Sequence, residues 1–208
     1  MQESKPITDY RQALKERIVT AAMQLFARHG VKAVRMDDIA AQLSISKRTL
    51  YEIYQNKELL LFEGIKHYHT RVTEKTRICA ANAANVMDVV LFVYQQKTEE
   101  FQLTSNKFYE DLEKYPDIIA YLRRERQKTQ NQYLEFMKRG VDEGYFRPDV
   151  NYAILSHLFE AIGSYMRDRR LYQLYTSEEL FRNLLFVTLR GICTPKGVEV
   201  LDHFPNKS

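Results

Sequence analysis

Apolar residues recur with the 3.6-residue period of an α-helix along most of this chain. In the first such stretch, Ile18, Ala21, Ala22, Leu25 and Phe26 form one stripe at spacings of three and four residues. No alternation typical of β-strands stands between turn dipeptides, and 7 Gly and 5 Pro are few for 208 residues. The sequence therefore predicts an all-α fold rather than a barrel, a Rossmann enzyme or a disordered chain.

Residues with strong helix-starting or helix-ending preferences divide this pattern into segments. Gly30 and Gly144 suit helix ends, Ser46 and Asn56 suit helix starts, and Thr176 with Glu179 forms a capping box. After a polar arm over about residues 1–10, the expected helices cover about 10–29, 36–43, 46–53, 56–77, 86–104, 106–114, 117–143, 150–170 and 177–192. The tail after residue 191, with its Pro and Gly residues, is expected to be irregular.

Composition excludes several classes of protein. No run approaches the roughly 18 uncharged apolar residues of a membrane helix, and the first residues lack the apolar core of a secretory signal, so we expect a cytoplasmic protein. Cys79 and Cys193 have no spacing that indicates a disulfide framework or a zinc site. No nucleophile motif, glycine-rich phosphate loop or paired-acid motif stands out. We therefore expect no enzymatic activity, no cofactor and no metal.

The most informative segment is Met36–Lys57, MDDIAAQLSISKRTLYEIYQNK. It contains two helical patterns too short to bury much alone, separated only by Ser44 and Ile45, so they must share a core with the first helix. The remaining face of the second pattern carries cations and hydroxyls, which suit phosphates and base edges. This arrangement predicts a helix-turn-helix whose recognition helix covers about 46–53. The residues expected to face DNA on or beside it are Ser46, Lys47, Arg48, Thr49, Tyr51, Tyr54 and Lys57.

A second interpretation of the same segment is structural. A basic face on a short helix is often only a solvated surface, and helix-turn-helix geometry also occurs in proteins that never contact DNA. The net charge of +4 permits an anionic partner without demanding one. Periodicity and charge alone leave both interpretations open.

The first 65 or so residues resemble the DNA-binding domain of the TetR family of bacterial repressors. RIVTAAMQLFARHGV is similar to the first helix and glycine turn of that family, MDDIAAQLSISKRTLYEIY to its helix-turn-helix, and YQNKELL to the start of its fourth helix. The resemblance implies that Lys47, Arg48, Thr49 and Tyr51 face the groove and backbone. Two residues depart from the family pattern.

Arg35 stands where the family commonly has a small hydroxyl residue that caps the second helix, and Ser44 where the turn commonly has glycine. Arg35 should weaken the cap but could add a phosphate contact. Ser44 should cost some strain if its φ is positive.

The last two expected helices carry apolar residues on more than one side. The segment 177–192 is apolar nearly all the way round, so it must be buried on two sides, for example within a dimer. Ser156 and Gly163, seven residues apart, would let another helix approach closely. A purely intramolecular core is the alternative, but TetR-like proteins form their dimer from the matching helices. We therefore expect a homodimer with Ser156, Gly163, Leu184 and Leu185 at the interface.

The chain has 14 Tyr and 11 Phe, many of them in the central helices. Such residues can line an apolar pocket, although any one of them more often belongs to the ordinary core. His157, Glu160 and Ser164 form a polar stripe that could lie beside the pocket, face solvent or cross a dimer. The residues expected to bind a small apolar or aromatic effector are Phe101, Phe108, Tyr109, Tyr121, Tyr133, His157 and Glu160.

The sequence thus predicts a helix-turn-helix domain over 11–71 and a helical effector-binding and dimerisation domain over 72–208. The expected function is a ligand-responsive transcriptional regulator, a repressor by resemblance, that binds a near-palindromic operator as a homodimer. One alternative is a DNA-binding regulator controlled by a protein partner. The other is a helical interaction protein that does not bind DNA.

Overall fold

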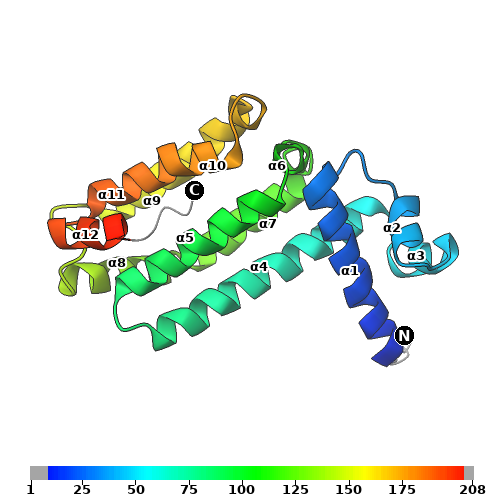
Figure 1. Cartoon of the computed structure of the whole chain (residues 1–208), viewed down its shortest axis with the longest axis horizontal. Helices are drawn as coiled ribbons and strands as arrows, with labels where there is room; N and C mark the ends of the chain where they lie inside the picture. The colour runs from blue at the N-terminus through cyan, green and yellow to red at the C-terminus, as the bar shows by residue number, and fades with distance from the viewer. Residues whose placement is uncertain (1–8, 204–208) are drawn as a thin grey trace.

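The computed structural model describes residues 9–203, and every regular element in that range is helical (Figure 1). This confirms the expected all-α fold; the N-terminal polar arm lies almost entirely outside the described residues. In chain order the α-helices are α1 (Asp9–His29), α2 (Met36–Gln42), α3 (Lys47–Ile53), α4 (Lys57–Asn82), α5 (Val86–Leu103), α6 (Asn106–Leu112), α7 (Pro116–Lys128), α8 (Gln130–Asp142), α9 (Tyr152–Asp168), α10 (Ser177–Leu180), α11 (Val187–Ile192) and α12 (Pro195–His203). A 3₁₀ turn, η1 (Leu171–Gln173), and a π-helical turn, η2 (Phe181–Phe186), complete the chain.

The local signals for helix starts and ends act as expected. The side chain of Ser46 accepts from the amide of Thr49, and that of Asn56 accepts from the amide of Leu59. Thr176 and Glu179 form the expected capping box at the start of α10. Gly30 and Gly144 end α1 and α8 with φ of 82° and 76°, a conformation in which a side chain would be strained.

The single helix expected over 117–143 is wrong, because it divides at Thr129 into α7 and α8. The backbone amide and hydroxyl of Thr129 both donate to the carbonyl of Arg126, at 3.2 and 3.1 Å. In an unbroken helix that carbonyl would accept from residue 130 instead. The interruption at Thr129 therefore has a local cause that apolar periodicity does not reveal.

The C-terminal segment also differs from expectation. The helix expected over 177–192 is interrupted by η2, and the tail expected to be irregular contains α12. Pro195 suits the first turn of α12, and Leu201 is buried in the core. A Cβ at Gly197 would stand 2.5 Å from the carbonyl oxygen of Tyr145, so glycine permits this close contact. The segment therefore forms a helix that packs against the turn after α8, although its Pro and Gly residues favour irregular structure.

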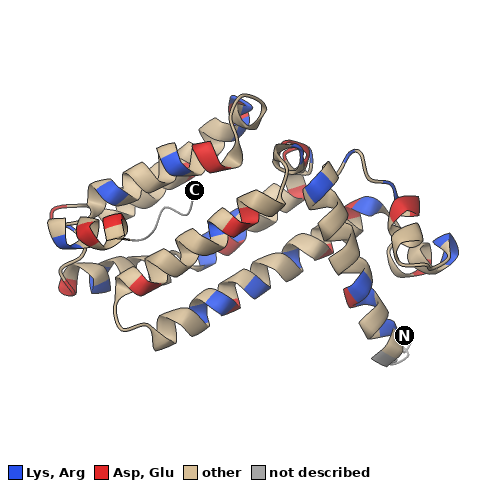
Figure 2. Cartoon of the chain, viewed as in Figure 1, with Lys and Arg blue, Asp and Glu red and all other residues tan. Residues whose placement is uncertain are grey.

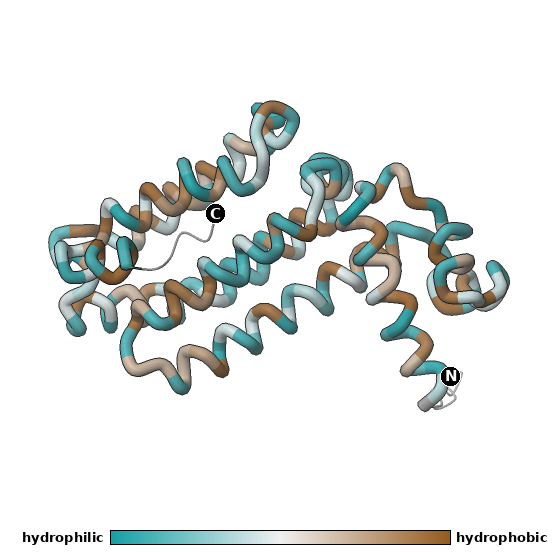
Figure 3. Tube along the Cα trace, viewed as in Figure 1, coloured by the Kyte–Doolittle hydropathy of each residue, from teal (hydrophilic) through white to brown (hydrophobic). Residues whose placement is uncertain are grey.

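The buried apolar residues form two separate cores. The first joins α1–α4 with α6 and α7 and includes Phe26, Leu50 and Leu61; the second joins α5, α8, α9, α11 and α12 around Phe146. Figure 3 shows apolar residues along helices of both halves of the molecule. Several aromatic side chains that connect α4, α5, α6 and η2 are only partly buried. Within 9–203, no helix combines the length and the apolar character that spanning a bilayer requires.

Candidate functional site

Helices α2 and α3 pack against α1 as a compact helix-turn-helix. Ile39, Ala40 and Leu50 are buried in the first core, so one side of each short helix is anchored. The turn between them depends on Ser44, which has φ of 54°, and on the amide of Ile45, which donates to the carbonyl of Ala40 at 3.1 Å. Ser44 therefore carries the positive φ for which glycine is preferred, as anticipated for this departure. The outer surface of α3 is left exposed.

The free face of α3 displays cations and an aromatic hydroxyl. The side chains of Lys47 and Arg48 are 66% and 88% exposed, and Tyr51 is 46% exposed. Figure 2 shows these basic residues at the outer end of the domain, next to the acidic start of α2. The hydroxyls of Ser46 and Thr49 lie 2.8 Å apart at the start of α3. This surface has the groups needed to contact both phosphates and base edges.

Both cations of α3 are paired with carboxylates in the free protein. The ammonium of Lys47 lies 2.5 Å from Asp37, and the guanidinium of Arg48 donates to Glu52 at 2.9 Å. These hydrogen bonds raise the pKa of Lys47 and of Arg48 above their ordinary values. Exposed ion pairs contribute little free energy, so exchange of either carboxylate for a DNA phosphate costs little.

Arg35 is exposed at the start of α2, and its side chain makes no cap hydrogen bond. Instead, its backbone amide donates to the Asp38 carboxylate at 2.7 Å. Asp38 thus supplies the carboxylate half of a capping box, while the half that a hydroxyl at position 35 would supply is missing. The guanidinium of Arg35 is left on the same surface as the start of α3.

Tyr54 and Lys57 occupy positions that differ from the phosphate-contacting ones expected. Tyr54 is 9% exposed in the first core, and burial raises its pKa to about 12. The ammonium of Lys57 donates to the carbonyls of Val31 and Val34, at 2.7 and 2.8 Å. Partial burial lowers the pKa of Lys57. Both residues therefore stabilise the helix-turn-helix itself, because their polar groups face the interior of the domain.

Replacing Lys57 with methionine is expected to lower the free energy of unfolding by about 1–3 kcal/mol, since two backbone carbonyls lose a charged donor while the apolar stem remains. Urea unfolding measures this loss. The dependence of DNA binding on salt should stay unchanged, because no phosphate contact is removed. Undiminished stability together with a shallower salt dependence would instead place Lys57 on the DNA.

Comparison with known proteins agrees with this geometry. Residues 18–63 match the family model described as bacterial regulatory proteins, tetR family. The HTH-type transcriptional repressor KstR2 of Mycobacterium tuberculosis is 24% identical over 140 residues, which cover 64% of this chain and 70% of that protein. Residues 18–63 of this chain are therefore a helix-turn-helix of the TetR type.

Other relatives share the helix-turn-helix or the whole fold. The HTH-type transcriptional repressor SCO4008 of Streptomyces coelicolor is 46% identical over 46 residues, 22% of this chain and 24% of that protein. A TetR-family regulator from Agrobacterium tumefaciens superposes with a TM-score of 0.64 at 12% identity, covering 88% of this chain and 99% of that structure. The chain therefore has the fold of these regulators, with an N-terminal helix-turn-helix domain and a C-terminal helical domain.

Helix α6 joins the helix-turn-helix domain to the C-terminal helices. The amide of Ser105 donates to the carbonyl of Ala27 near the end of α1, at 2.7 Å. Asp111 is buried, and its carboxylate accepts from the amide of Lys32 at 2.7 Å and from Lys114 at 2.6 Å. Burial alone would raise the pKa of Asp111, but these hydrogen bonds hold it below its ordinary value.

The expected effector residues do not form a single group. Phe101 and Phe108 both contact Tyr109, with ring centroids 6.3 and 5.6 Å away, and Phe108 is also buried in the first core. Tyr121 packs against Phe62 there, and Tyr133 packs in the second core with a buried hydroxyl that has no hydrogen-bond partner.

The polar stripe of α9 is not among these aromatic contacts. His157 and Glu160 are exposed and make none of these ring contacts, so their role in binding an effector stays a prediction. They lie on the outer side of α9, which the helical period alone could not distinguish from an inner one.

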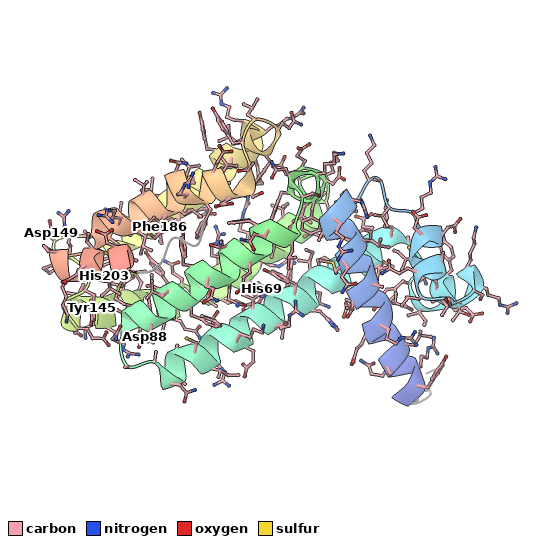
Figure 4. All side chains as sticks on the ribbon, in the orientation of Figure 1. His69, Asp88, Tyr145, Asp149, Phe186 and His203 are labelled. Carbon is pink, nitrogen blue, oxygen red and sulfur yellow. The ribbon has the colours of Figure 1, made fainter. Side chains whose placement is uncertain are left out.

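The structure brings two of the expected effector residues, Phe101 and Tyr109, together with four further aromatic residues. Tyr94, Phe101, Tyr109, Tyr172, Phe181 and Phe186 form a continuous set of ring contacts, called here the aromatic cluster. Figure 4 labels Phe186 on the side of η2 that faces α5. Tyr68 and Tyr109 donate hydrogen bonds to Glu100 beside this cluster. In the sequence, Glu100 follows Lys97 by three residues, a spacing typical of an ordinary surface ion pair.

The expected interface residues are distributed differently on α9. Ser156 is half-buried, donates to the carbonyl of Ala153 at 2.7 Å and accepts from Gln130 of α8 at 2.9 Å, so it packs against its own chain. Gly163 lies on the same side as Ser156, and Leu184 and Leu185 are half-buried. About half a turn from Ser156 and Gly163, exposed apolar side chains follow one stripe: Ile154, Leu158, Ala161 and Tyr165.

Proposed function

We propose that this TetR-family regulator is a ligand-responsive repressor that binds a near-palindromic operator as a homodimer. Residues 11–71 would read DNA, and residues 72–208 would dimerise and bind the effector. The observation that carries the proposal is the free face of α3, where Lys47, Arg48 and Tyr51 are exposed on a helix anchored from behind by Leu50. Such a helix fits the major groove.

A single α3 would contact too few base pairs to specify a site, so two copies are needed. In a symmetric dimer the two recognition helices would stand roughly 34 Å apart, one turn of B-DNA. Among the expected DNA contacts, Arg35, Ser46, Lys47, Arg48, Thr49 and Tyr51 keep that role in the proposal. Tyr54 and Lys57 support the domain from inside instead.

Dimerisation is supported by the apolar stripe on α9. Ile154, Leu158 and Tyr165 are 66%, 46% and 56% exposed, and Val187 on α11 is 58% exposed. Scattered exposed apolar residues are common, but a stripe along one helix flanked by a second apolar helix is typical of an interface. The same stripe on a second copy would cover it, with Leu184 and Leu185 at its edge.

The response to ligand is supported by the contacts of α6. Asp111 and Ser105 bond this helix to the end of α1 and the following turn, while Tyr109 of α6 belongs to the aromatic cluster. A ligand that packs against Tyr109 more tightly in one position of α6 would shift the helix-turn-helix domain with it. The shift is limited by the ligand's difference in affinity for the two positions.

Selection of genomic DNA fragments on the purified protein tests the proposal. The expected result is enrichment of fragments that share two inverted half-sites about one helical turn apart, because each copy of α3 reads one half-site. Sequencing of the retained fragments measures this. Retention without any shared sequence would favour non-specific binding, and no retention at all would favour the interaction protein without DNA binding.

A further inference from the structure

The aromatic cluster is built next to a carboxylate that lies inside the C-terminal domain. Glu100 of α5 has a side chain only 17% exposed. Its Oε1 accepts from the hydroxyl of Tyr109 at 3.0 Å, and its Oε2 accepts from the hydroxyl of Tyr68 on α4. Burial is the main cause that raises the pKa of both tyrosines, so their hydroxyls stay protonated and donate to the carboxylate.

Aromatic rings contact one another beside Glu100. Tyr109 stacks on Tyr172 with centroids 5.2 Å apart, and Phe101 contacts both Tyr109 and Phe181. Phe181 begins η2, and π-helical turns occur often at functional sites. One cation–π contact is already present next to Glu100: the guanidinium of Arg71 lies 5.9 Å from the ring of Tyr68.

A second carboxylate beside the cluster has an unused acceptor. Glu113 follows Tyr109 by four residues, so both lie on one face of α6. The Oε1 atom of Glu113 is buried without a hydrogen-bond partner, and burial raises the pKa of this residue. A buried acceptor without a partner needs a donor, which a bound ligand can supply.

The present cation partner of Glu100 is easily replaced. Lys97 lies 2.7 Å from Glu100, one turn earlier on α5, and its side chain is 38% exposed. Because the Lys97 side chain is partly exposed, its ammonium can turn outward to water when another cation takes its place.

We propose that the aromatic cluster and Glu100 bind a monovalent organic cation with an aromatic or apolar body. The carboxylate would pair with the positive charge, and the faces of Tyr109, Tyr172 and Phe101 would cover the apolar groups. Rings and a carboxylate together favour cations over anions of the same shape, because the π-face and the carboxylate are both negative. This inference rests on the proposed ligand response and names the class of its effector.

Calorimetric titration of the full chain with tetraphenylphosphonium tests the proposal, with tetraphenylborate as a probe of the same shape and opposite charge. The expected result is saturable binding of the cation, at least about tenfold tighter than binding of the anion. Equal affinities, tighter binding of tetraphenylborate or no binding of tetraphenylphosphonium would each overturn the proposal. Because these titrations contain no DNA, their outcome is separate from whether the protein retains an operator.

Single substitutions at three neighbouring residues of α5 locate the binding site. Glu100→Gln should weaken the binding of tetraphenylphosphonium about tenfold or more, because the neutral amide keeps the size of the side chain and removes its charge. Lys97→Gln should strengthen binding, since it removes the competing cation. Glu99→Gln is the matched control: Glu99 is exposed and its carboxylate accepts from Gln95 at 3.0 Å, away from the cluster. Equal effects of Glu99→Gln and Glu100→Gln would contradict the assignment.

Discussion

Replacing Leu158 with glutamate is expected to convert the protein into a folded monomer that retains operator DNA at least about 100-fold less well. Leu158 lies at the centre of the exposed apolar stripe on α9, between Ile154 and Tyr165. In the proposed dimer the new carboxylate would be removed from water without a partner, which costs several kcal/mol. The loss of the second recognition helix then removes half of the DNA contacts.

Sedimentation velocity and fragment retention measure these two effects. Leu103→Glu is the matched control, because Leu103 is 71% exposed near the end of α5 and lies outside the stripe. It should leave both assembly and DNA binding unchanged. A wild-type protein that sediments as a monomer at micromolar concentration, or a Leu158→Glu variant that remains dimeric, would contradict the proposed interface.

Replacing Arg48 with alanine is expected to lower the free energy of operator binding by about 1–3 kcal/mol and to relax sequence preference at one position of each half-site. Arg48 is the most exposed cation of α3, and its guanidinium is held in the free protein only by a surface pair with Glu52. A guanidinium can exchange that pair for the two acceptors of a guanine edge, which gives the base discrimination.

Competition binding with a library of half-site variants measures the effect. Arg77→Ala is the control, since Arg77 is also exposed and paired with an acidic residue three positions earlier, but lies near the end of α4, far along the chain from α3. It should bind the operator as the wild type does. If Arg48→Ala folds normally and keeps full affinity and selectivity, the face of α3 does not read bases.

The folding of the helix-turn-helix could be predicted almost entirely from sequence because its signals are local. Ser46 and Asn56 cap helices through amides three residues away, and Gly30 ends α1 with a positive φ. The apolar spacing of Ile39 and Leu50 leads them to a common core. In such short elements, the residues that decide the structure are close together in the chain.

The roles of long polar side chains in that domain depended on tertiary contacts. Lys57 looks like a surface cation in sequence, yet its ammonium reaches carbonyls 23 and 26 residues earlier. Tyr54 is similar, since its amphipathic ring suits either a phosphate or a core. A residue type with two acceptable environments is assigned to one of them only when the chain is packed.

The sequence by itself determined the helical class, the helix-turn-helix and its exposed cations, because these follow from periodicity, capping and residue chemistry within short stretches. Only the tertiary structure decided which aromatic residues meet, which side of α9 is left exposed and which carboxylate lies inside. Glu100 meets Tyr68, 32 residues earlier, and Tyr109 meets Tyr172 on a distant element. Such contacts are set by how whole helices pack and by interruptions such as Thr129 and η2, and these depend on contacts far apart in the chain.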